Sequence, residues 1–60
     1  MKERIEKAIE LGFLKKTEGV IEEIERTAKK MQEEGWGFLN SRTDLDLNLI
    51  ILIFEREINN

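Results

Sequence analysis

Four oxygen-bearing side chains near the end of the chain have the spacing of calcium ligands. The first, third, fifth and twelfth positions of this window are Asp44, Asp46, Asn48 and Glu55. An EF-hand loop has ligands at these positions but needs glycine at the sixth, where this chain has Leu49. Residues 50–54 are all apolar, which is typical of a buried strand. We therefore expect a polar segment that precedes a buried strand, and we predict no metal site and no cofactor.

Catalytic chemistry has few residues to use. The chain contains no histidine, cysteine or tyrosine. Its serine, Ser41, has no evident base and lies in a polar stretch that is typical of a turn. Paired carboxylates such as Glu33 with Glu34, or Glu55 with Glu57, need a cleft to act as acid and base, and 60 residues provide little material to enclose one. We predict that the protein is not an enzyme and has no catalytic residues.

Length and charge limit the class of protein. Residues 1–60 suffice for one domain, and a domain of this size buries only about 60% of the surface that its unfolded chain exposes. Because the sequence has no cysteine or histidine, neither disulfides nor a Cys/His zinc site can stabilise it. The net charge of −3 gives no attraction to nucleic acid. Apolar runs are far shorter than the roughly 20 residues that span a membrane, so we expect a cytoplasmic protein.

Two amphipathic stretches predict helices. Met1, Ile5, Ile9 and Phe13 recur at every fourth residue, which predicts a short first helix. The C-terminal end of this helix is not determined, because residues 10–16 fit helix, strand or loop. The second helix is expected over about 18–34, after Thr17 as N-cap, and Gly35 fits the left-handed position that closes the last turn. The apolar stripe of this second helix comprises Val20, Ile21, Ile24, Ala28 and Met31.

The rest of the chain predicts an antiparallel hairpin. "WGFLN" and residues 45–58 have strand composition, and the polar "SRTD" connects them. With the turn centred near Arg42, Trp36 lies opposite Asn48, and the second strand extends about nine residues beyond the first. The expected fold class is α+β: one short and one longer helix packed on one face, followed by the hairpin.

The extended strand would expose apolar side chains and unpaired backbone together, so we expect a second chain to complete the sheet. A two-fold dimer is the first choice, and a monomer covered by its two helices is the alternative. The predicted oligomer interface consists of Leu49, Ile50, Ile51, Leu52, Ile53 and Phe54.

Three residues are candidates for contact with a partner or ligand. Trp36 is either a core residue or an exposed anchor for a partner, and Phe38 follows it in the same strand. Arg42 could meet an anionic group. Gly37 between the two aromatic residues gives them room or marks a bulge.

The chain also resembles a family of short bacterial and phage proteins classed as a domain of unknown function. The resemblance is carried by an acidic helix followed by Gly35, Trp36 and Phe38, and by a last strand that ends in Ile-Phe-Glu-Arg at residues 53–56. It covers about residues 18–58 and implies a compact α+β module without catalytic residues. Members of that family begin with a strand, whereas residues 1–14 here are patterned as a helix.

Three functions remain as hypotheses. The first is a non-catalytic oligomeric protein that binds another protein, such as a phage or mobile-element inhibitor of host machinery. The second is a protein that sequesters a small molecule or nucleotide in a pocket between subunits, formed by Trp36, Phe38 and Arg42. The third is a structural or designed scaffold.

Overall fold

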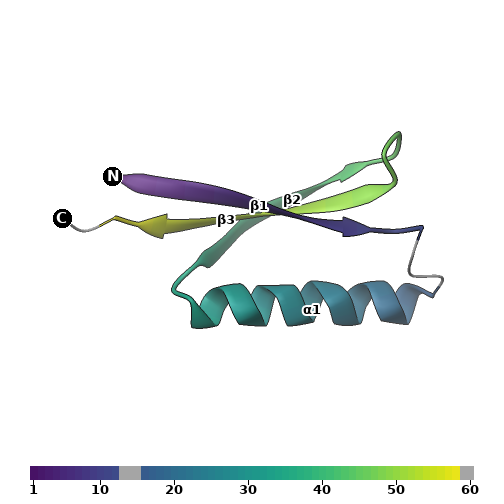
Figure 1. Ribbon diagram of the computed structural model, residues 1–60, viewed down its shortest axis with the longest axis horizontal. Helices are drawn as coiled ribbons and strands as arrows, with labels where there is room; N and C mark the ends of the chain where they lie inside the picture. Colours follow the sequence, from purple (N-terminus) through teal and green to yellow (C-terminus); the bar gives the residue numbers. More distant parts are fainter. Residues whose placement is uncertain (13–15, 59–60) are drawn as a thin grey trace.

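Three strands and one helix make up the part of the chain that the structure describes. The computed structural model describes residues 1–12 and 16–58. The elements are β1 (Lys2–Glu10), α1 (Thr17–Glu33), β2 (Gly37–Asp44) and β3 (Leu49–Glu57). The strands form an antiparallel sheet in the order β1-β3-β2, and α1 lies along one face of it (Figure 1). The predicted α+β class is thus correct, but the sheet has its third strand from the same chain.

The predicted first helix is wrong, because Lys2–Glu10 is a strand that pairs with β3 along its whole length. A spacing of four residues satisfies both the helical period of 3.6 and the strand period of two, so Ile5 and Ile9 share a face in either structure. Both pack against the core from the helix side of the sheet. The helix that was expected to distinguish this chain from the resembled family is therefore not formed over Lys2–Glu10, while the resemblance itself stays a prediction. Phe13 lies outside the described residues.

The second predicted helix is confirmed, with bounds of Thr17–Glu33, but the predicted N-cap is wrong: Lys16 occupies the N-cap position and Thr17 is the first helical residue. Gly35 has the expected left-handed conformation, with a φ of 91°. Its N–H donates to the carbonyl of Gln32 at 3.0 Å, and the N–H of Trp36 donates to the carbonyl of Met31 at 2.9 Å. These two bonds form a Schellman motif, which ends the helix and sends the chain back toward the sheet.

The hairpin is confirmed, but its predicted turn and register are wrong. Asp44 pairs with Leu49, so the turn lies at residues 45–48 and "SRTD" belongs to β2. Asn48 has a φ of 57°, and the Asp44 carboxylate accepts the N–H of Leu47 at 3.1 Å. A polar, exposed edge strand resembles a loop in composition, which explains the error. The expected overhang does not exist, because β3 is paired on both of its edges.

A β-bulge in β2 determines which of its side chains face the helix. Phe38 pairs with Phe54, whereas Asn40 pairs with Ile53, so the strand changes face between them. Phe38 consequently lies on the helix side of the sheet. Arg42, opposite Ile51, lies on the helix-free side. Residues 38 and 42 would share a face in a regular strand.

The core lies between α1 and the middle of the sheet. Met31 of the helix packs there against Ile9, Leu52 and Phe54, and Phe54 is only 1% exposed. The half-buried residues around this cluster are Ile5, Ile24, Ala28, Trp36 and Ile50. Few side chains are fully buried, as expected for such a short chain.

The apolar run of β3 is thus covered in two different ways. Ile50, Leu52 and Phe54 face α1, while the alternate residues Leu49, Ile51 and Ile53 face away from it. Ile51 is nevertheless only 9% exposed. The premise that this strand needs a second chain to pair its backbone is therefore wrong, since β1 and β2 do so.

Candidate functional site

The outer edge of β2 is the first part of the candidate site. In the described residues β2 pairs with β3 on one side only, so alternate backbone N–H and C=O groups along its other side point away from the sheet. Seven of the eight β2 residues are exposed. Such an edge can accept another strand unless charge, proline or a covering element prevents it.

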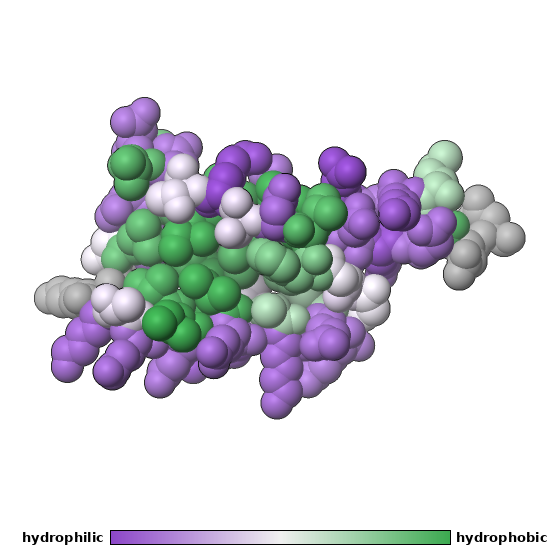
Figure 2. All heavy atoms as spheres, turned by 180° about the vertical axis from the view of Figure 1, so that it is seen from behind, coloured by the Kyte–Doolittle hydropathy of each residue, from purple (hydrophilic) through white to green (hydrophobic). Residues whose placement is uncertain are grey.

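Apolar side chains border this same edge. Ile21 and Ala28 are seven residues apart, hence on one side of α1, and Phe38 of β2 lines a hollow together with Ala28. Ile21 is 48% and Phe38 56% exposed. Figure 2 views the molecule from the β2 side and shows a green apolar band between the helix below and the sheet above. We call this surface the β2 flank, defined as Ile21, Ala28, Gln32, Trp36 and Phe38.

The β2 flank contains an open hollow beside the end of the helix. It has a volume of about 430 Å³ and is lined by Ala28, Gln32, Gly35, Trp36, Gly37 and Phe38. Its side chains are apolar except for the Gln32 amide. The hollow can therefore bind a partner through hydrophobic contact and through the backbone of the Gly-Trp-Gly turn.

Trp36 is held by Arg56 of β3, which is itself bonded to β1. The guanidinium of Arg56 lies over the Trp36 ring, 4.4 Å from its centroid, and Arg56 also bonds to Glu3 of β1. Phe38 contacts Phe54 edge-to-face, with the ring centroids 5.7 Å apart. Cation–π and aromatic contacts of this kind each contribute about 0.5–1.5 kcal/mol. The aromatic part of the β2 flank is thus anchored to the core.

The opposite side of the helix has a different chemistry. Lys7 of β1 reaches toward α1 there and borders a second open hollow. The other residues around this hollow are Glu23, Arg26, Thr27, Lys30, Met31 and Glu34. We call this surface the β1 flank, defined as Lys7, Glu23, Arg26, Lys30 and Glu34. It is charged where the β2 flank is apolar.

Arg42 is separated from the two aromatic candidates. Its guanidinium bonds to the carboxylate of Glu6 at 3.4 and 3.5 Å, so the pair bridges β2 and β1 across β3 on the helix-free face. This bridge crosses the part of the sheet where Ile51 lies, which fits the low exposure of Ile51. The structure thus brings Trp36 and Phe38 together but places Arg42 on the other face.

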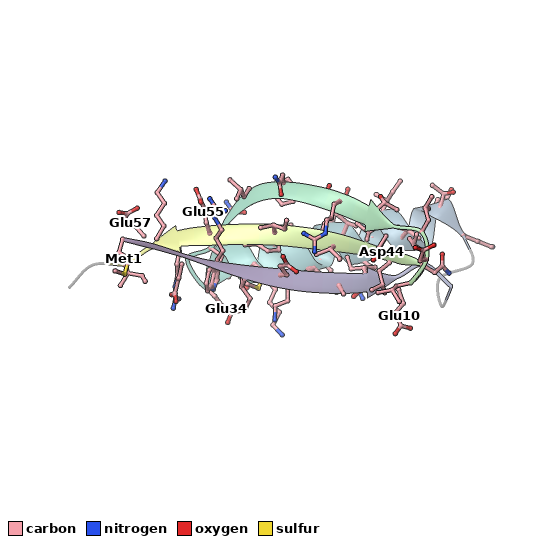
Figure 3. The ribbon with its side chains drawn as sticks, turned by 90° about the horizontal axis from the view of Figure 1, so that it is seen from above. Met1, Glu10, Glu34, Asp44, Glu55 and Glu57 are labelled. Carbon is pink, nitrogen blue, oxygen red and sulfur yellow. The ribbon has the colours of Figure 1, made fainter. Side chains whose placement is uncertain are left out.

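The four residues with calcium-ligand spacing are spread along the hairpin. Asp44 ends β2 and caps the turn, whereas Glu55 lies six residues beyond Leu49, about 20 Å along β3. Glu55 pairs with Lys2 at 3.5 Å and Arg4 at 3.7 Å. Figure 3 shows Glu55 and Asp44 toward opposite ends of the sheet. Among residues 1–12 and 16–58 no three acidic side chains are grouped to hold a metal ion.

Two features of the surface were missed in the sequence. Ile21 fits the apolar stripe of the helix and was expected in the core, but it lies at the margin of the stripe and is half exposed. Leu45 and Leu47 at the hairpin tip are 81% and 66% exposed. They alternate with polar residues as a strand would, and a cue for the tip is Asn48, a residue type that tolerates the left-handed conformation.

Comparison with known proteins adds no relative. The chain gives no significant match to any family model, curated protein or solved structure. Within the described ranges no helix has the length and apolar character needed to cross a bilayer. The function must therefore be inferred from the β2 edge and the β2 flank themselves.

Proposed function

We propose that this protein is a non-catalytic interaction module that binds an extended segment of a protein chain along the outer edge of β2. The observation that carries the proposal is that two suitable surfaces lie next to each other. The edge of β2, with its free backbone groups, and the apolar β2 flank lie on the same side of the molecule. An added strand would form hydrogen bonds with the backbone of the β2 edge and would also cover the apolar β2 flank.

The two surfaces would contribute differently to binding. Backbone hydrogen bonds along the edge favour any extended segment, whatever its sequence. Alternate side chains of that segment point toward α1, where they meet Ile21, Ala28 and Phe38. We therefore expect selection for apolar residues at every second position.

A small-molecule function has one observation in its favour, the hollow beside Trp36. Its volume of about 430 Å³ is within the range of ligand sites, and Trp36 emission would report occupancy. Its walls, however, carry no charged side chain, and Arg42 lies on the opposite face. Arg56, the cation over the Trp36 ring, is already bonded to Glu3, so nucleotides and other anions have less support than an apolar segment, and the protein-binding function is preferred.

The proposal can be tested by selecting peptides from a random library on the immobilised protein. Bound peptides should contain apolar residues at alternate positions, and their binding should weaken at least about tenfold in an Ile21→Glu variant, since loss of one buried apolar contact is worth about 1.4 kcal/mol. Leu47→Glu is the matched control, because it places the same charge on an exposed leucine at the hairpin tip. Peptides that bind both variants alike would refute the proposed site.

A further inference from the structure

This inference rests on the proposed function and names the partner at the same site. We propose that the segment bound at the β2 edge is β2 of a second copy of this chain. The two copies pair antiparallel, edge to edge, and form one continuous sheet with three strands from each copy. The resulting dimer has two-fold symmetry, the commonest arrangement of homo-oligomers.

Symmetry explains why a copy fits both surfaces. Antiparallel pairing of identical strands places the two-fold axis between them, perpendicular to the sheet, so both helices stay on the same side of the joined sheet. The β2 flank of one copy then faces the β2 flank of the other. Ile21 and Phe38, which are half exposed in one copy, become covered by the corresponding apolar surface of its partner.

The expected distance between the two helices leaves room for these side chains. Each helix lies over a sheet whose central strand is β3 (Figure 1), so the two helices are about three strand spacings apart, roughly 14 Å. Packed helices are usually 8–10 Å apart. The additional space requires large apolar side chains between the helices, and the β2 flank supplies Phe38 and Ile21 from each copy.

The available area agrees with a dimer of moderate affinity. The Cα extents of the molecule are 43 × 23 × 13 Å, and the β2 flank is on one of its two broad sides (Figure 2). β2 has eight residues and is about 26 Å long. A strip of this length across the 23 Å width of the broad side has an area of about 600 Å². Two copies would bury about 1,200 Å², the lower limit of standard interfaces.

The opposite edge does not offer the same fit. A dimer through β1 would bring two copies of the β1 flank together, with Lys7 and Lys30 of each copy near the joint. Lys7 points toward the helix side of the sheet, and an inward-pointing charge is one of the known ways to prevent edge pairing. The copy is therefore expected at β2 alone.

The test is sedimentation velocity of the whole chain from about 1 to 500 µM. The protein should change from about 7 kDa to about twice that mass as the concentration rises. In Ile21→Glu the dissociation constant should rise by about tenfold or more, whereas Leu47→Glu should leave it unchanged. Circular dichroism confirms that each variant is folded. A monomer throughout the concentration range, or a dimer that survives Ile21→Glu, would overturn the proposal.

Hydrogen exchange provides a second readout that needs no variant. Outward-facing amides of β2 should exchange more slowly as the concentration rises, while those of β1 should not change. Equal behaviour of the two edges would also count against the dimer. A monomer that still captures peptides at the β2 edge would leave the proposed function intact and refute only the second copy as partner.

Discussion

The two sides of α1 differ in chemistry, and the two edges of the small sheet beneath it differ in the same way. On the β1 side, Lys7 and the helix residues Arg26 and Lys30 surround the groove with charge. On the β2 side, the exposed side chains include the apolar Ile21 and Phe38, each about half exposed. In the part of the chain that the structure describes, both edges have free backbone groups, so the side chains beside an edge, and not the backbone, decide which edge can accept a strand.

The strongest test of this contrast replaces one residue on each side by alanine. Phe38→Ala should lower the free energy of unfolding by about 1–2 kcal/mol, because it removes the edge-to-face contact with Phe54 and uncovers the core. Lys7→Ala should change it by less than about 0.5 kcal/mol, since Lys7 is exposed. Urea unfolding followed by circular dichroism measures both. Equal losses would show that the two sides support the fold alike.

A second test concerns the backbone that positions Trp36 on the β2 flank. Gly35→Ala should cost about 1 kcal/mol, because Gly35 has a φ of 91°, where a Cβ atom is strained even though no atom obstructs it. Gly37→Ala is the matched control. Its Cβ would lie 3.7 Å from the Glu55 carbonyl, an ordinary contact, so its stability should stay within about 0.5 kcal/mol of the wild type. A neutral Gly35→Ala in urea unfolding would contradict the Schellman interpretation.

The smallest expected effects come from two ion pairs of β1, Glu3 with Arg56 of β3 and Glu6 with Arg42 of β2. Glu3→Gln should cost up to about 1 kcal/mol, because Arg56 also holds the Trp36 ring, and Glu6→Gln should cost less. Both pairs are exposed to solvent, so 1 M NaCl should reduce both effects. A double-mutant cycle on Glu3 and Arg56 isolates the coupling. A larger loss from Glu6→Gln would place the more important bridge on the helix-free face.

Much of the fold could be predicted where the residues allow one reading. The long helix has a stripe at the 3.6-residue period, and Gly35 marks its end. The N-terminal strand could not be assigned in this way, because Ile5 and Ile9 satisfy both periods and only their pairing with β3 distinguishes them. The register of the hairpin was missed because the polar half of β2 has the composition of a turn.

The candidate site was predictable only in part. Trp36 and Phe38 were expected to act together, and the structure places them on one hollow. Arg42 was expected beside them, but the bulge after Phe38 moves it to the other face. Gly37 indicated a bulge as one of two interpretations, but a glycine alone does not tell which later side chains change face. The exposure of Ile21 depends on the helix covering only the middle of the sheet, which no local pattern reports.

The strand order β1-β3-β2 also governs how the chain acquires its structure during synthesis. The middle strand is the last one to leave the ribosome, so β1 and β2 have no neighbour to pair with until β3 emerges. The pairings of β1 join residues that are from 39 (Glu10 with Leu49) to 55 (Lys2 with Glu57) positions apart, a topology that slows folding. A nascent chain that stalls before residue 49 therefore lacks the strand with which both β1 and β2 pair, and the sheet forms only after translation has supplied its centre.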